Sequence, residues 1–196
     1  MKHNKIFTIP NILSLSRIVM IPFIVLLYCV AKNSVAAGIL LILSGVSDIA
    51  DGQIARRCGM ISDLGKALDP IADKLTQGAV LLCLATRVPL VLIPLLMLAC
   101  KELLLGILGC LTIYRTGLVS MAAWHGKLAT ALLYLLMITH LLLPSIPVGA
   151  SVGAVILCSV CILLSFILYL AHFFKILKEH PLTKEEKAHE TLHRRI

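Results

Sequence analysis

Residues 47–74 read SDIADGQIARRCGMISDLGKALDPIADK, and this stretch places Asp48, Asp51, Asp69 and Asp73 at or near the ends of two long apolar runs. A charged side chain near the centre of a bilayer costs about 2.5–3.5 kcal/mol on insertion scales. Four carboxylates at the ends of two predicted transmembrane helices therefore indicate a function. The stretch decides both the expected fold and the expected site.

The spacing of these residues puts the carboxylates on defined helix faces. An α-helix turns about 100° and rises about 1.5 Å per residue, so Asp48 and Asp51 lie on one side of the first helix. Asp69 and Asp73 lie on one stripe of the second helix. Small residues at Gly52, Ala55 and Gly65 allow two antiparallel helices to approach closely. The four carboxylates are therefore expected to converge.

Converging carboxylates repel one another unless cations lie among them, and two divalent ions would balance four negative charges. All-oxygen ligands favour Mg²⁺ or Mn²⁺ over zinc. A site with two metal ions suits displacement at phosphorus, because it holds the attacking and the leaving oxygens together. Arg56, on the same side of the first helix, is placed to bind a phosphate oxygen.

The composition indicates a polytopic membrane protein. The 196 residues are 59% hydrophobic and 14% charged, whereas soluble domains are roughly a quarter charged. Each apolar run is near the ~20 residues that cross a bilayer. The runs are 12–30, 34–50, 67–85, 89–114, 121–143 and 148–174. We expect an all-α bundle of about six transmembrane helices, preceded by a short interfacial segment at 5–11.

The formal net charge of +8 is concentrated in segments that fall on one side of this topology. The positive-inside rule then puts both termini and the active site in the cytoplasm. Residues 1–178 are the expected membrane domain, and 179–196 are a charged cytoplasmic tail. A nucleic-acid partner is not expected, because so apolar a chain lacks a water-exposed basic surface.

The run D-x-x-D-G-x-x-A-R-x8-G-x-x-x-D-x-x-x-D, matched without a gap from Asp48 to Asp73, resembles the signature of the CDP-alcohol phosphotransferase family. The similarity extends to Ile9-Pro10-Asn11 and to Gly126-Lys127. It implies an enzyme of the bacterial cytoplasmic membrane that transfers a phosphatidyl group from CDP-diacylglycerol to an alcohol. It also implies a homodimer among membrane lipids.

The resemblance assigns roles to individual residues. The four aspartates Asp48, Asp51, Asp69 and Asp73 would bind two Mg²⁺ or Mn²⁺ ions, and Asp73 would also be the general base. The residues that would bind the CDP-lipid are Asn11, Arg17, Gly52, Ala55, Arg56 and Ser62. For Arg17, snorkelling from a helix end explains the sequence equally well.

The segments TIPNILSLSR, LGKALDPIADK and HGK resemble bacterial phosphatidylglycerophosphate synthases, which use sn-glycerol 3-phosphate. This anionic acceptor would account for cations at Lys101, Arg115 and Lys127. Glu102 shares a helix face with Lys101 poorly, so Lys101 is expected to face the metal cavity or an acceptor phosphate. The sequence departs from those enzymes at Lys101, where arginine is usual, and at Ala129, where a second lysine is usual.

Other acceptors remain open. Phosphatidylglycerol, as in cardiolipin synthase, is the nearest alternative, and inositol phosphate and serine are further ones. A cation or proton transporter would also explain aspartates in the membrane, but it leaves Arg56 and the two glycines of the motif without a role.

Overall fold

The computed structural model describes residues 9–58, 63–116 and 124–179, and these residues form helices without a β-strand. The elements are α1 (Ile9–Val25), a π-helical turn η1 (Leu26–Val30), α2 (Ser34–Cys58), α3 (Asp63–Ala85), a 3-10 turn η2 (Pro89–Val91), α4 (Leu92–Thr116), α5 (Trp124–Leu142) and α6 (Val148–Glu179). Side chains are described for residues 14–47, 68–113, 124 and 126–176. The all-helical fold expected from the sequence is confirmed.

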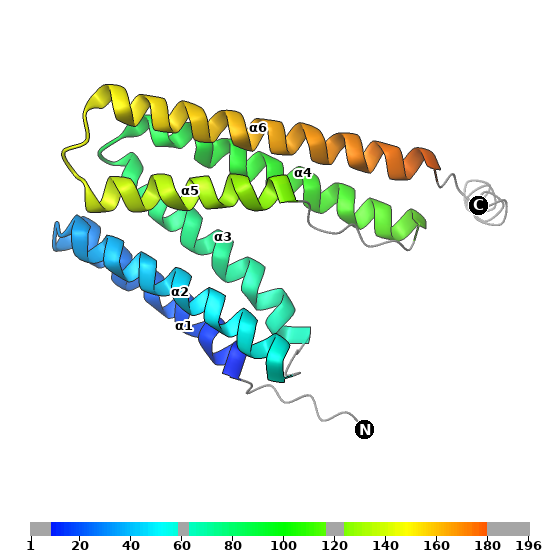
Figure 1. The fold of residues 1–196 in the computed structure, drawn as a ribbon, viewed down its shortest axis with the longest axis horizontal. Helices are drawn as coiled ribbons and strands as arrows, with labels where there is room; N and C mark the ends of the chain where they lie inside the picture. The colour runs from blue at the N-terminus through cyan, green and yellow to red at the C-terminus, as the bar shows by residue number, and fades with distance from the viewer. Residues whose placement is uncertain (1–8, 59–62, 117–123, 180–196) are drawn as a thin grey trace, which may run out of the picture.

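The helices form two groups that converge at one end of the molecule (Figure 1). Helices α1 and α2 are an antiparallel pair, whereas α4, α5 and α6 lie together in the second group. Helix α3 runs from the first group to the second and contacts α1, α4 and α5. The connections at 31–33, 86–88 and 143–147 lie at the convergent end, which we call the closed end. The two groups separate toward the opposite, open end.

The hydrophobic core joins the two groups of helices. Fully buried side chains come from α1, α2, α3, α5 and α6, and they include Ile24, Leu41, Leu81, Leu133 and Ile162. Helices α2 and α5 approach so closely that a Cβ atom built on Gly38 would lie 2.8 Å from Leu142 Cδ2. Only glycine permits this approach without movement of the neighbour.

Polar contacts fix the turns at the closed end. The side-chain oxygen of Asn33 accepts a hydrogen bond of 3.0 Å from the backbone N–H of Ala36 and so caps the start of α2. Arg87 donates to the Ser34 hydroxyl at 2.7 Å, and its guanidinium lies 4.7 Å from the centre of the Tyr28 ring. One side chain after α3 thus contacts both η1 and the start of α2.

The outer faces expose many large apolar side chains, which is uncommon for a water-soluble chain. Within the described residues two segments, Pro89–Ile113 and Val148–Ile176, are long and apolar enough to cross a membrane. The apolar segments Ser14–Val30, Ser34–Ser47 and Gly126–Leu142 are shorter. A helical membrane protein is consistent with these surfaces.

Two expected boundaries were wrong. The break expected at 57–65 is narrower, because α2 continues to Cys58 and α3 begins at Asp63. The expected interfacial segment at 5–11 overlaps α1, which begins at Ile9. Pro10 lies in the first turn of α1, where its missing N–H removes no helical hydrogen bond. The tail at 179–196 lies outside the described residues except for Glu179, which ends α6.

Candidate active site

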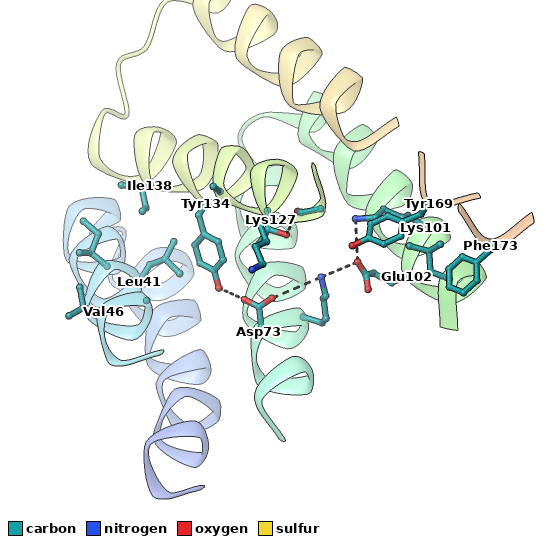
Figure 2. A pocket seen from close by; sticks show the side chains of 17 residues that line it. Leu41, Val46, Asp73, Lys101, Glu102, Lys127, Tyr134, Ile138, Tyr169 and Phe173 are labelled. Carbon is teal, nitrogen blue, oxygen red and sulfur yellow. Dashed lines mark hydrogen bonds and ion pairs between the residues drawn. The ribbon is translucent and has the colours of Figure 1, made fainter. Parts of the chain in front are cut away.

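A cavity of about 980 Å³ lies among α2, α3, α4, α5 and α6 (Figure 2). This volume is at the upper end of the range for small-molecule sites. Its apolar lining includes Leu41, Ile42, Val46, Leu105, Ile138 and Phe173. Its polar lining includes Asp73, Lys74, Lys101, Glu102, Lys127, Thr130, Tyr134 and Tyr169. The cavity therefore has one apolar wall and one charged wall.

Asp73 on α3 is the carboxylate of this cavity that the sequence singled out. Its Oδ1 accepts a hydrogen bond of 2.7 Å from the Tyr134 hydroxyl on α5, and its Oδ2 accepts one of 2.8 Å from Gln77 Nε2, one turn further along α3. Lys74 Nζ lies 4.0 Å from Oδ2. Asp73 is therefore held mainly by neutral donors.

Asp69, one turn before Asp73 on α3, has a different set of partners. Its Oδ1 accepts hydrogen bonds from the Ser14 hydroxyl and from Arg17 Nη2, the latter at 3.2 Å. Asp69 is not among the described lining residues of the cavity. Arg17 is only 3% exposed, so it is buried against α3 and does not snorkel toward a membrane surface.

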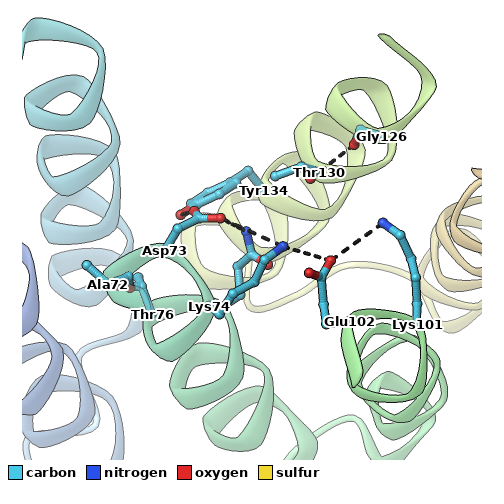
Figure 3. A network of polar contacts seen from close by, with 10 residues as sticks. Ala72, Asp73, Lys74, Thr76, Lys101, Glu102, Gly126, Thr130 and Tyr134 are labelled. Carbon is cyan, nitrogen blue, oxygen red and sulfur yellow. Dashed lines mark hydrogen bonds and ion pairs between the residues drawn. The ribbon is translucent and has the colours of Figure 1, made fainter. Parts of the chain in front are cut away.

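The charged wall is a chain of alternating charges from α3 to α4 (Figure 3). Glu102 Oε1 lies 3.0 Å from Lys74 Nζ and 3.6 Å from Lys101 Nζ. Lys101 is 5% exposed and lines the cavity, and its ammonium is 5.8 Å from the centre of the Tyr169 ring. Lys101 and Glu102 pair although neighbours along a helix share a face poorly, because both long side chains line the same cavity.

Helix α5 contributes the opposite wall. Thr130 hydrogen-bonds the carbonyl of Gly126 at 3.1 Å, and Lys127 is exposed at the cavity edge. A Cβ atom built on Gly126 would lie 2.7 Å from the Tyr169 hydroxyl, so glycine lets α5 and α6 come together here. Lys101 and Lys127, both expected to bind the acceptor, share one cavity with Asp73.

The remaining expected site residues are described only by their backbone or not at all. Asp48, Asp51, Gly52, Ala55 and Arg56 lie on the last turns of α2. Asn11 lies in the first turn of α1, and Arg115 near the end of α4. Their side chains, and Ser62 altogether, lie outside the described part of the chain. Figure 1 shows the end of α2 and the starts of α1 and α3 at the same end of the molecule.

Sequence reasoning missed several polar residues in and beside the cavity. Glu102, Lys74, Gln77 and Tyr134 are all part of the hydrogen-bonded and ion-paired network around Asp73. A signal for Tyr134 was present in the sequence, since Gly126, Thr130 and Tyr134 recur every four residues and so line one face of α5.

The carboxylates that line the cavity are oxygen donors, the type of ligand that hard cations bind. Among the described lining residues there is no histidine or cysteine, and the carboxylates are those of Asp73 and of Glu102, which is paired with Lys74 and Lys101. No group of three or more metal-binding side chains occurs among the described residues. Two of the four expected ligands, Asp48 and Asp51, have side chains outside that set. The residues present fit Mg²⁺ or Mn²⁺ in donor type.

Comparison with known proteins identifies relatives of this chain. The family model of CDP-alcohol phosphatidyltransferase matches residues 7–177. A CDP-diacylglycerol–glycerol-3-phosphate 3-phosphatidyltransferase of Rickettsia typhi is 38% identical over 101 residues, which are 50% of this chain and 56% of the relative. A cardiolipin synthase (CMP-forming) of Streptomyces coelicolor is 40% identical over 114 residues, which are 55% of this chain and 53% of the relative. The chain spans about half the length of the curated relatives it matches.

Proposed function

The chain belongs to the CDP-alcohol phosphatidyltransferase family, and from this premise we propose that it transfers a phosphatidyl group from CDP-diacylglycerol to sn-glycerol 3-phosphate and releases CMP. The observation that supports this best is the cavity in which Asp73 faces Lys74, Lys101 and Lys127. The similarity to the Rickettsia typhi enzyme supports the same acceptor.

The proposed setting is the bacterial cytoplasmic membrane. Residues 1–178 would form six spans with both termini and the active site on the cytoplasmic side, and 179–196 a charged tail. The alternating direction of the six α-helices that the structure describes, together with their exposed apolar faces, supports this arrangement. A homodimer surrounded by membrane lipids is proposed on the family resemblance alone.

Asp48, Asp51, Asp69 and Asp73 would together hold two divalent ions, Mg²⁺ or Mn²⁺. When bound, the ions neutralise charge on the donor pyrophosphate and on the leaving CMP. Asp73 and Asp69 present oxygen donors from one stripe of α3, and the last turns of α2 lie at the same end of the molecule. Both features support this assignment.

The CDP-lipid would lie with its acyl chains in the bilayer and its pyrophosphate beside the aspartates. Asn11, Arg17, Gly52, Ala55, Arg56 and Ser62 are its proposed contacts. Arg56 would hold a phosphate oxygen through paired N–H donors. Arg17, which pairs with Asp69, would keep one cation next to the donor phosphates.

The acceptor would occupy the charged side of the cavity. Lys101 and Lys127 line it, and Arg115 is the third proposed cation for the acceptor phosphate. Asp73 would take the proton of the acceptor hydroxyl, whose oxygen then bonds to the lipid-side phosphorus. The bond from that phosphorus to the CMP oxygen breaks, and CMP leaves.

Phosphatidylglycerol is the second candidate acceptor. The similarity to the Streptomyces coelicolor cardiolipin synthase supports it, and so does the apolar wall formed by Ile42, Val46 and Ile138. A lipid acceptor would place its acyl chains along this wall.

The test is CMP release by purified protein with CDP-diacylglycerol and Mg²⁺, with one acceptor in each reaction. Turnover confined to sn-glycerol 3-phosphate is the expected result. If phosphatidylglycerol is the only acceptor that supports turnover, the protein is a cardiolipin synthase. An absence of CMP release with every acceptor, from folded protein supplied with Mg²⁺ or Mn²⁺, would overturn the proposal.

A further inference from the structure

We infer that Tyr134 on α5 is a positioning residue for Asp73, which fixes the direction in which this carboxylate presents its oxygens to a divalent cation. The inference rests on the proposed role of Asp73 as a metal ligand. Its observational basis is the 2.7 Å hydrogen bond from the Tyr134 hydroxyl to Asp73 Oδ1 (Figure 2).

The carboxylate of Asp73 is held at both oxygens. Tyr134 binds Oδ1, while Gln77, which is fully buried at 0% exposure, binds Oδ2 at 2.8 Å. Rotation of the carboxylate about its Cβ–Cγ bond would break one or both hydrogen bonds, since their geometry is directional. An ionised carboxylate offers about four lone-pair sites, so each oxygen keeps a site for a further ligand.

Both donors are neutral, and this distinguishes Asp73 from Asp69. The guanidinium of Arg17 offsets the charge of Asp69 at 3.2 Å. A phenol and an amide instead orient Asp73 while leaving its negative charge for a cation. Metal ligands are commonly held in this way, and loss of the orienting group costs about 10–100-fold in metal affinity or activity.

Among the side chains that the structure describes, the nearest cation to Asp73 is paired with another carboxylate. Lys74 Nζ is 4.0 Å from Asp73 Oδ2 but 3.0 Å from Glu102 Oε1 (Figure 3). Glu102 thus keeps the Lys74 ammonium from taking the place of a metal ion at Asp73. Because Lys74 pairs with Glu102, the carboxylate of Asp73 is oriented by Tyr134 and Gln77.

The position of Tyr134 is fixed by the packing of α5. Leu133 and Met137 on either side of it are 0% exposed in the core. The aromatic side chain has only two rotatable bonds, so a fixed backbone places the hydroxyl with little freedom. A phenylalanine would fill the same space at the cavity wall, and hence the hydroxyl itself is the group to test.

The experiment measures Mn²⁺ binding by isothermal titration calorimetry in the absence of lipid substrate. It compares the purified unmodified protein with three variants, Tyr134→Phe, Asp73→Asn and Tyr169→Phe. The expected result is a Mn²⁺ affinity about 10-fold or more lower in Tyr134→Phe. Tyr169→Phe removes a hydroxyl from the same cavity but not from Asp73, and it should bind Mn²⁺ as the unmodified protein does. In turnover assays, Tyr134→Phe should lower kcat and raise the Mn²⁺ concentration that gives half-maximal activity. The KM for CDP-diacylglycerol should stay unchanged.

The two proposals fail in different ways. Equal Mn²⁺ affinity of Asp73→Asn and the unmodified protein would overturn the metal role of Asp73. If Asp73→Asn loses Mn²⁺ while Tyr134→Phe, with an unchanged melting temperature, binds it normally, only the role of Tyr134 is overturned. If Tyr134→Phe melts at a lower temperature, Gln77→Met provides the second variant, and unchanged Mn²⁺ affinity in this variant would also contradict orientation of Asp73 by neutral donors.

Discussion

The guanidinium of Arg17 on α1 lies 3.2 Å from the carboxylate of Asp69 on α3, and it links the first helix to the stripe that contains Asp73. Arg17 is buried, whereas the side chain of Asp69 is 44% exposed. A buried cation is costly to leave without its counter-charge. The pair therefore joins α1 to α3 one turn before Asp73.

Substitution of Arg17 by methionine should lower the free energy of unfolding by about 1–3 kcal/mol, because hydrogen bonds to charged groups contribute on this scale. The partial exposure of Asp69 keeps the loss below that of a fully buried pair. Thermal unfolding in detergent measures the effect. Arg17→Lys should lose less, and equal stability of all three proteins would contradict a structural role for the pair.

Substitution of Asp73 by asparagine should abolish CMP release while the protein stays folded in detergent. The loss should exceed about 100-fold, which is the upper end for residues that only orient a metal ligand. Chelation of divalent cations should have the same effect on the unmodified enzyme, and added Mg²⁺ or Mn²⁺ should restore it. Normal turnover of Asp73→Asn, or of Asp69→Asn, would contradict the metal assignment.

Substitution of Lys101 by methionine should raise the KM for sn-glycerol 3-phosphate and leave that for CDP-diacylglycerol unchanged. A charge-assisted hydrogen bond contributes about 1.5–3 kcal/mol, which corresponds to roughly 10–150-fold in affinity. The control is Lys32→Gln, in the exposed turn at the closed end. An unchanged KM for sn-glycerol 3-phosphate in Lys101→Met would show that Lys101 does not bind the acceptor.

Substitution of Gly38 by alanine should destabilise the bundle by about 1–3 kcal/mol, the usual cost of overpacking. The new methyl group would meet Leu142 at 2.8 Å and Leu141 at 3.1 Å. Gly106→Ala is the matched control, because nothing lies within 4 Å of a Cβ atom at that position of α4. The control should be neutral or more stable by up to about 1 kcal/mol, since alanine favours helix. The expected outcome is a lower melting temperature for Gly38→Ala and an unchanged or higher melting temperature for Gly106→Ala.

The sequence predicted the helices well because hydrophobic length is a local property. Prolines at positions 89 and 144, beside short polar segments, marked turns that the structure contains. Helix ends near the motif were harder to predict, since α2 continues to Cys58 and α3 begins at Asp63, both inside the segment expected to be a break. The aspartate stripe on α3 could be predicted from spacing alone.

The partners of that stripe could not be predicted, because they come from other helices. Tyr134 meets Asp73 only through the packing of α5 against α3, and Glu102 meets Lys74 only through that of α4. Spacing along one helix has no information on such contacts. The pairing of Lys101 with Glu102 was missed for another reason, since helix-face geometry ignores the reach of long side chains.

The contact of Arg87 with Tyr28 and Ser34 has a mechanical consequence. It ties the connection after α3 to η1 and to the start of α2, so a rotation of α1 and α2 against α4, α5 and α6 would have its fulcrum here. Under such a rotation displacement grows in proportion to distance from the fulcrum. The buried core would then shift by little, while the same angle would move the far ends of the helices by the greatest amount.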